Sequence, residues 1–375
     1  MGIQAKLTKS IRSILSHSLL GAVSLEALER SISGDYHPYP TLAERVLTDA
    51  TTSMNFLPSA RAVQTPTYST PDIFTLNLHG IYFCPEYNIL HTEARQIIEE
   101  SISTQRDLEQ FDFKVFYQTP IETIAEVCSL FRSHKNGYYH TLIDNLPRLY
   151  LLHHPRYQDI NTINLLCSSQ PTQVEQFYLD KLLPDNARIK LVEPNKRYLL
   201  KNLIFPSFLS RRFSGYLPSE YLAWFIKKVA PQRPRKKVNR IFISRIATHK
   251  GRQRCLLNEE ELLATLKPYG FKPYVLEHMS IEEQIALFYD AEAVVAAHGA
   301  GLANTIFSEQ ITVLELFPTA FVLPHYYFLS RALGHHYQYW CAQKTGIYDN
   351  FYANIPKILM FLDRFSPSSQ QQVSE

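Results

Sequence analysis

Cysteine is scarce in this chain of 375 residues, and its pattern excludes two common uses of the residue. There are five cysteines, an odd number, with no CxxC pair and no metal-ligand spacing among them. Several stand in apolar stretches, as buried thiols in a reducing compartment do. The sequence therefore predicts a cytoplasmic protein without a disulfide framework or a zinc-binding cysteine cluster.

Long apolar runs are also missing. No uninterrupted run approaches the ~20 residues that a membrane-spanning helix needs. We expect no signal peptide, because no apolar segment with a small-residue cleavage site follows the basic first residues. The segment Lys6–Leu28 is predicted to form an amphipathic helix. We favour a helix packed on its own domain, and peripheral attachment to the inner face of a membrane is the alternative.

Charge is low and nearly balanced. Charged residues make up 19% of the chain and the net charge is +3, too little to predict a nucleic-acid-binding protein. From Lys227 to Arg254, however, there are eleven Lys or Arg and no Asp or Glu. Such a run is usually a solvated linker or surface, although it can attract an anionic ligand. Few aromatic residues interleave it, so the stacking platforms of nucleic-acid binders are lacking and we expect no nucleic-acid partner.

The length suits two domains of typical size, and 45% of the residues are hydrophobic. We expect an N-terminal helix and irregular extension over 1–75 and an N-terminal domain over 76–230. A second domain follows a basic, proline-containing stretch and spans 238–345. A terminal helical segment at 346–365 and a disordered tail at 366–375 complete the chain.

Strands and helices alternate through the second domain. The expected strands are "NRIFISR", "FKPYVLE", "AVVAA", "ITVLELF" and "HHYQYWCA", and the helices between them are "NEEELLATLKPYG", "SIEEQIALFYDA", "AGLANTIF" and "VLPHYYFLSRALG". Asn258 and Gly270 are the expected caps of the first helix, and Ser280 with Glu283 forms a capping box on the second. In the first domain "HTEARQIIEESIST" is predicted to be helical. The alternation and the apolar strands predict an α/β fold with mostly parallel sheets and helices on both faces.

"AHGAGLAN" (Ala297–Asn304) combines two glycines and a histidine where a strand is expected to end. Ligands of open α/β sheets bind at the carboxyl ends of strands, and glycine lets the backbone approach them. The N–H groups of a following helix favour an anion such as a pyrophosphate. The alternative is a turn that needs glycine only for its dihedral angles. GxGxxG, the P-loop and GxSxG patterns are all absent.

Cations stand near this turn in the predicted sheet. Arg245 ends a strand on the ligand side, and Lys250, Arg252 and Arg254 follow in a loop. Arginine suits bidentate contacts with phosphate. A solvated loop is an equally good interpretation of Lys250 and Arg252. Glu315, near the end of "VLELFP", could accept hydrogen bonds from ribose hydroxyls or be paired with another group.

"GYYHTLIDNLPRLY" places His140 and Asp144 four residues apart, which puts them on one face of a helix. Such a pair is often an ordinary helix contact. A histidine that reaches a substrate hydroxyl can also take its proton, and Asp144 could orient the imidazole or act as the base. Pro147 is expected to kink or end the turn. Arg148 could bind a phosphate or pair with a carboxylate.

Two parts of the chain resemble glycosyltransferase family 61. Between Arg240 and Pro318 the similar pieces are "FISR", "RCLLNEEEL", "LEHMSIEEQIALFYDAEAVVAAHGAGLANTIF" and "VLELFP". In the other half "NGYYHTLIDNLPRLYLL" (Asn136–Leu152) resembles the family's N-terminal motif. Members that resemble the chain build capsular or extracellular polysaccharides or modify glycoproteins.

The resemblance implies a GT-B-like fold, in which two Rossmann-type domains face a cleft and the C-terminal one holds most of the donor. It implies an inverting hexosyl- or pentosyltransferase that uses a UDP-sugar, a glycan or polysaccharide acceptor and no cofactor. His140 and Asp144 become the candidate catalytic base. The residues that it assigns to the donor nucleotide are Arg245, Arg254, His298, Gly299, Ala300, Gly301, Leu302, Asn304 and Glu315, with Arg148, Ser244, Lys250 and Arg252 as further candidates.

No DxD motif occurs in the chain, so the metal site of the other main glycosyltransferase fold is missing from the sequence. We therefore expect a metal-independent enzyme, in which helix dipoles and fixed cations neutralise the leaving diphosphate. A protein of the same fold that binds a nucleotide or glycan without turnover is the alternative. The sequence indicates no oligomeric state.

Overall fold

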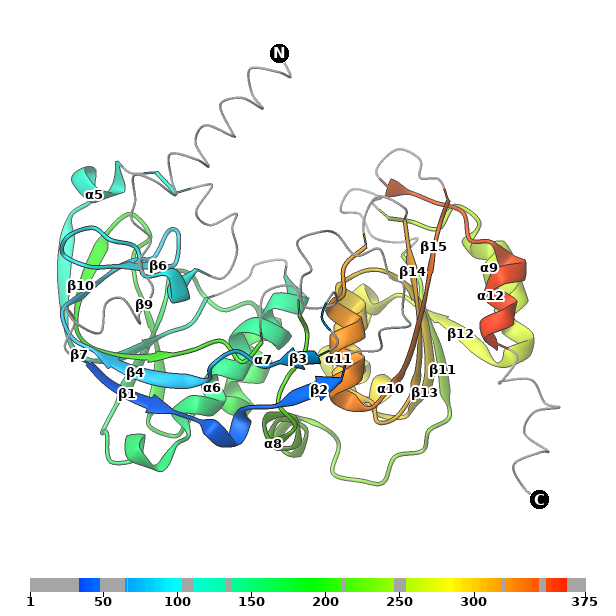
Figure 1. Cartoon of the computed structure of the whole chain (residues 1–375), viewed down its shortest axis with the longest axis horizontal. Coiled ribbons are helices and arrows are strands. Elements are labelled where there is room, and N and C mark those ends of the chain that lie inside the picture. The colour runs from blue at the N-terminus through cyan, green and yellow to red at the C-terminus, as the bar shows by residue number, and fades with distance from the viewer. Residues whose placement is uncertain are drawn as a thin grey trace, which may run out of the picture. The chain divides into compact units, whose positions relative to one another are not determined.

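The computed structural model describes residues 34–47, 65, 67–102, 111–112, 114–132, 137–210, 214–245, 254–318, 322–343 and 349–362. The chain forms two compact units, whose elements are labelled in Figure 1. Unit 1 comprises residues 1–43 and 71–212, and unit 2 comprises 44–70 and 213–375. Helix α8 (Ser219–Val229), expected in the N-terminal domain, lies in unit 2. The predicted N-terminal helix and C-terminal tail lie outside the described residues.

Unit 1 is built on an eight-stranded sheet that is half parallel. Strands β10, β7, β8 and β9 pair in parallel, whereas β1, β4, β5 and β6 form antiparallel pairs. The parallel half agrees with the predicted α/β fold, and the antiparallel half was not predicted. The bounds are β1 Gly34–Pro38, β4 Phe74–Leu78, β5 Ile81–Cys84, β6 Ile89–His91, β7 Ile121–Leu130, β8 Ile163–Cys167, β9 Ala187–Leu191 and β10 Arg197–Pro206.

The segment predicted to be helical from residue 91 onward has a different structure. It continues from β6 into a loop and a single 3-10 turn, η2 (Glu99–Ser101). Ile97 and Ile98 are fully buried, and the Ser101 hydroxyl accepts from the N–H of Leu90 at 3.1 Å and donates to the carbonyl of Ile98 at 2.6 Å. The helical prediction is wrong here because packing on the core of unit 1 outweighs local helix propensity.

The helices of unit 1 are short, and one begins with a capping box. In α7 (Gln173–Leu182) the hydroxyl of Thr172 accepts from the N–H of Glu175, whose carboxylate accepts in return. The other helical segments are η1 (Pro40–Leu42), α5 (Val115–Gln118), η3 (His140–Asn145), α6 (Leu146–Leu152) and η4 (Pro155–Tyr157). No helix in the described part of the chain is long and apolar enough to cross a bilayer.

Unit 2 contains a five-stranded sheet in which every pair is parallel. Its order is β12 (Phe271–Tyr274), β11 (Asn239–Ile243), β13 (Ala291–Ala297), β14 (Thr312–Phe317) and β15 (His336–Cys341). The chain runs outward from β11 to β12, then returns past β11 to β13 and continues in the other direction. A parallel sheet binds ligands at the carboxyl ends of its strands where the order reverses, which here is between β11 and β13.

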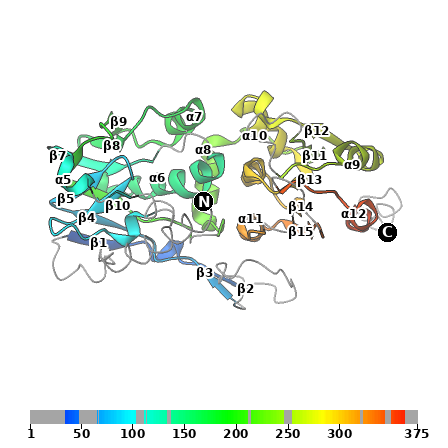
Figure 2. The ribbon, with the colours of Figure 1, turned by 90° about the horizontal axis from the view of Figure 1, so that it is seen from above.

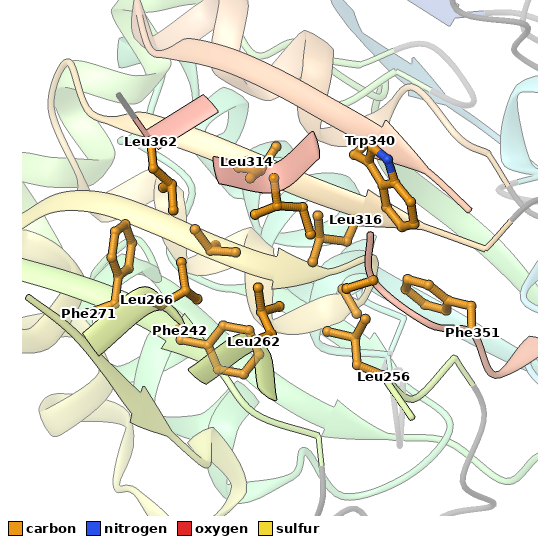
Figure 3. Close-up of a cluster of buried hydrophobic side chains, with 14 of the residues drawn as sticks. Phe242, Leu256, Leu262, Leu266, Phe271, Leu314, Leu316, Trp340, Phe351 and Leu362 are labelled. Carbon is orange, nitrogen blue, oxygen red and sulfur yellow. The ribbon is translucent and has the colours of Figure 1, made fainter. Parts of the chain in front are cut away.

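Helices cover both faces of this sheet, as predicted (Figure 2). On one face α9 (Glu259–Leu266) and α12 (Ile355–Leu362) enclose the apolar cluster shown in Figure 3. The other face carries α10 (Ile281–Tyr289) and α11 (His325–Leu333), and η7 (Ala300–Phe307) contacts both helices. A two-stranded ribbon, β2 (Arg45–Leu47) and β3 (Thr67–Ser69), joins unit 2 through Tyr68, whose ring lies 4.7 Å from that of Phe328.

The predicted helix caps of unit 2 are confirmed in part. The capping box of α10 is present, with the Ser280 N–H donating to Glu283 at 2.7 Å, and Gly270 ends the turn η5 (Lys267–Tyr269) with a φ of 80°. Asn258 does not cap α9 with its side chain. Its amide instead donates to the carbonyl of Ala353 at 3.0 Å and accepts from the N–H of Ala353 at 2.8 Å. Asn258 therefore joins the start of α9 to the segment before α12.

Candidate functional site

The turn that follows β13 lies at the order reversal of the parallel sheet. Arg245, just after β11, donates from Nη1 to the carbonyl of His298 at 2.6 Å. The hydroxyl of Tyr326, from α11, donates to the carbonyl of Gly299 at 2.7 Å. Side chains from two elements therefore hold consecutive carbonyls of the turn, while Ala300 is exposed and the two glycines beside it are half-buried.

A side chain at either glycine would collide with a neighbouring side chain. A Cβ on Gly299 would lie 2.5 Å from Nη1 of Arg245, so a side chain here would displace the guanidinium. A Cβ on Gly301 would lie 2.9 Å from Cδ1 of Leu276 and 3.4 Å from Cγ2 of Ile243. Neither glycine has a left-handed φ. The interpretation that the turn needs glycine for its dihedral angles is therefore wrong.

Arg245 and Arg254 are brought together at this strand end. Burial lowers the pKa of Arg254, the charge of Arg245 lowers it further, and Asp349 opposes this more weakly. Arg254 also adopts a φ of 58°, which L-residues rarely do and which is often found at functional sites. Two neighbouring half-buried cations favour an anionic ligand. Lys250 and Arg252 lie outside the described residues.

Behind the turn, His298 is bound to a fully buried carboxyl group. Its Nδ1 lies 2.5 Å from Oε1 of Glu315, and the hydroxyl of Tyr337 donates to Oε2 at 2.5 Å. Burial raises the pKa of Glu315 well above its ordinary range. Burial also lowers the pKa of His298 to about 3, with Arg254 and Arg245 adding to the effect. Both shifts favour the uncharged forms of His298 and Glu315.

The burial of Glu315 changes its expected role. Both of its oxygens are engaged within the protein, and none of its surface is exposed. Contact with a ribose hydroxyl, as expected from the sequence, does not fit this position. The carboxyl group instead holds the His298 ring, which also stacks on Phe317 with ring centres 5.1 Å apart.

Three further candidates for the donor site have buried side chains. Leu302 is a core residue, and the Ser244 hydroxyl is hydrogen-bonded to the Glu259 carboxylate. Asn304 has no exposed surface and donates to Oε1 of Gln284 at 3.1 Å. These side chains do not reach the surface of the site, so their position corrects the expectation of direct contact with a nucleotide.

In unit 1, the predicted His140–Asp144 pair is formed. Nδ1 of His140 lies 2.6 Å from Oδ2 of Asp144, and the side chains are 41% and 23% exposed. The two residues stand in the π-helical segment η3, a conformation that is frequent at functional sites. Pro147 does not end the helix. It lies in the first turn of α6, which follows η3 directly and continues to Leu152.

Arg148 is a structural residue of unit 1. It is buried, and its Nε and Nη2 donate to the carbonyl of Pro206 at 2.9 and 2.8 Å. Its guanidinium lies over the rings of Phe205 and Phe208 at 5.2 and 4.5 Å. Burial lowers the pKa of Arg148 to about 10. Arg148 therefore binds the last carbonyl of β10 and links α6 to that strand, where the sequence led us to expect a phosphate or a carboxylate as its partner.

The basic run contains several structural ion pairs. Arg233 pairs with Asp290 at 2.7 Å, and Arg240 pairs with Glu292 at 2.8 Å. Their acidic partners come from later in the chain and are not visible in the local sequence. Among the residues that the structure describes, the run is therefore not a continuous free basic surface.

A parallel sheet with an arginine-lined turn at its order reversal is typical of α/β enzymes that bind anionic ligands at strand ends. The comparison with family models names the family. The model Glycosyltransferase 61 matches residues 138–314, a little under half of the chain. This part of the chain matches glycosyltransferase family 61, as the resemblance predicted, and the family implies glycosyltransferase activity. No curated protein matches the chain significantly.

The matched region includes parts of both units. It contains His140, Asp144, Arg245, Arg254 and the whole glycine-containing turn, and it ends one residue before Glu315.

Sequence reasoning did not identify three residues that shape the turn, namely Gln284, Tyr326 and Tyr337. Gln284 stands in the motif that carries the family resemblance, so its place in that motif could have identified it as a residue of the site. The two tyrosines lie in a predicted helix and strand with no pattern that distinguishes them from other aromatic residues.

Proposed function

We propose that the protein is an inverting glycosyltransferase that moves a sugar from a UDP-sugar to a hydroxyl group of a glycan or polysaccharide. The observation that carries the proposal is the meeting of Arg245 and Arg254 at the His298–Gly301 turn. The proposal includes the GT-B-like fold that the family resemblance implies, with the donor bound mainly by unit 2 and the acceptor by unit 1.

The arginines supply the charge that the leaving group requires. Negative charge grows on the β-phosphate as its bond to the sugar breaks, and fixed donors aimed at that charge stabilise the transition state. Guanidinium groups bind phosphate oxygens with two parallel hydrogen bonds. The missing side chain of Gly299 leaves room for the Arg245 guanidinium beside the turn. In this proposal no metal ion is needed to neutralise the diphosphate.

The His140–Asp144 pair supplies the base. Asp144 holds Nδ1 of the imidazole, so the acceptor proton passes to Nε2. The acceptor oxygen attacks the anomeric carbon from the side opposite the diphosphate. The bond between that carbon and the β-phosphate oxygen breaks, and its electron pair leaves with UDP. One displacement inverts the anomeric configuration.

The test is a screen of UDP-sugars by thermal shift and calorimetry, because a ligand of the folded state raises the melting temperature. Arg245→Ala and Arg254→Ala should each weaken UDP binding by ~1–3 kcal/mol, the range for hydrogen bonds to charged groups. Arg45→Ala is the matched control, since Arg45 is exposed on β2 of the same unit. Failure of UDP and every UDP-sugar to bind, or equal losses in the control, would contradict the proposal.

A further inference from the structure

Unit 1 contains a hollow that the proposed transfer chemistry does not use. Its volume is about 420 Å³, within the usual range for small-ligand sites. All of its lining residues belong to unit 1, and neither His140 nor Asp144 is among them. Its polar lining includes Asp35, His37, Asn77, His79, Arg156 and Asn202.

The register of the sheet places much of this polar lining on one face. Asp35 of β1 pairs with Asn77 of β4, and Asn77 pairs with Ile204 of β10. Directly paired residues share a face, with Cβ atoms ~4.5–5.5 Å apart. His37 and Asn202 lie two residues from Asp35 and Ile204 along their strands, so they point the same way. A polar row therefore crosses three neighbouring strands.

The opposite face of the same strands is apolar. Leu76, Leu78 and Phe205 belong to the buried core cluster of unit 1. The wall of the hollow comes from the segment after α6, where the buried Tyr157 donates its hydroxyl to Oγ1 of Thr75 at 2.6 Å. This bond fixes the wall against β4, so the hollow is a built feature of the unit.

The chemistry of the lining suits a ligand with many neutral hydroxyl groups. Asp35 offers acceptors, Arg156 offers donors, and the two amides and two imidazoles provide both. The Asp35 carboxylate forms no ion pair or hydrogen bond with any other residue that the structure describes. It would repel a phosphate at this position. Ile160 and Ile204 add apolar surface for the C–H groups of a sugar ring.

We propose that this hollow binds a neutral saccharide, separately from the transfer site. The proposal rests on the proposed function in one respect: the saccharide is a part of the acceptor glycan remote from the reacting hydroxyl. Along the chain, the His140–Asp144 pair precedes the seven-residue helix α6, which spans about 10 Å, and Arg156 and Tyr157 of the hollow follow it. An acceptor of several sugar units would engage both positions at once, and a single sugar would engage only one.

The test measures binding in place of turnover. Neutral methyl glycosides and disaccharides of common hexoses and pentoses are titrated into the full chain, with saturating UDP present, and followed by saturation-transfer NMR and calorimetry. We expect at least one to bind without displacement by UDP. Asp35→Ala and Arg156→Ala should each weaken it by about tenfold, as expected for loss of a charge-assisted hydrogen bond. Asp185→Ala, at an exposed aspartate of unit 1 outside the hollow, should leave it unchanged.

Four outcomes would overturn the inference. They are the absence of binding by every saccharide, binding that persists in both hollow variants, displacement by UDP, and competition by inorganic phosphate. UDP affinity should be the same in all these variants, because Arg245 and Arg254 are untouched. A failure of the saccharide experiment with intact UDP binding would therefore reject the hollow and leave the proposed function standing.

Discussion

Replacing Gly299 by alanine should weaken donor binding with little loss of stability. The new Cβ would lie 3.3 Å from Cζ of Arg245 and 2.5 Å from Nη1, and the second distance is shorter than real Cβ atoms show. The backbone of the turn is fixed by Tyr326, so the guanidinium is the group that must move. Its hydrogen bond to the carbonyl of His298 then breaks.

The size of the effect follows from the two contacts that Arg245 would lose. A hydrogen bond to a charged group contributes ~1.5–3 kcal/mol, and displacement of the guanidinium also removes its proposed contact with the diphosphate. UDP affinity should therefore fall by roughly 10- to 150-fold, since 1.4 kcal/mol is a factor of ten. The unfolding free energy of unit 2 should change by about 1 kcal/mol or less, because the displaced end of Arg245 is flexible and half-buried.

Gly301→Ala is the matched comparison. Its Cβ would meet Leu276 and Ile243 in the packed interior, so it should lower stability by ~1–3 kcal/mol, as overpacking does. Calorimetric titration with UDP and thermal denaturation measure both properties in both variants. The reasoning fails if Gly299→Ala binds UDP as the wild type does. It also fails if Gly301→Ala loses UDP affinity to the same degree without losing stability.

Three other predictions concern the base, the pH dependence and the metal. His140→Ala and Asp144→Asn should each lower kcat by ~10²–10⁴-fold with UDP affinity retained, and the double variant should be little worse than the poorer single; near-normal turnover in both singles would place the base elsewhere. Burial lowers the pKa of His91 and of His335 to about 4. Between pH 6.5 and 4 the unfolded chain binds protons at these histidines and the folded chain does not. The free energy of unfolding should therefore fall over this range by at most about 3 kcal/mol per histidine. A denaturation midpoint that does not change with pH, or the same pH dependence of stability in His91→Phe, would refute this. Transfer should persist in excess EDTA, and complete loss restored by manganese would refute a metal-free reaction.

The sequence predicted the elements of unit 2 well because each carries a local signal. Its strands are short apolar runs, and Ser280 and Gly270 mark helix ends through side-chain and backbone geometry that depends on neighbouring residues alone. The strand order was not predictable in the same way. The strand order depends on which buried faces meet. Strand β12 follows β11 in the chain but lies at the edge of the sheet, while β13 pairs with the other side of β11, and the spacing of the strands along the chain does not indicate this.

The sequence predicted which residues belong to the candidate site better than it predicted what each of them does. Arg245, His298 and Glu315 all lie at the expected strand ends, but only the structure distinguishes a surface residue from one beneath it. Glu315 lies behind His298 because Tyr337, from the next strand, encloses it. That contact depends on a parallel register between β14 and β15, which pairs Val313 with Tyr337. No local pattern in the sequence contains this information.

The most direct test of the central claim is the anomeric configuration of the reaction product. The purified chain is incubated with the UDP-sugar that the binding screen selects and with an acceptor glycan, and the new glycosidic linkage is identified by NMR. Our account predicts a transferred sugar whose anomeric configuration is opposite to that in the donor. A retained configuration would contradict a single displacement assisted by the His140–Asp144 pair, and the absence of transfer from every UDP-sugar to every acceptor would contradict the proposed function itself.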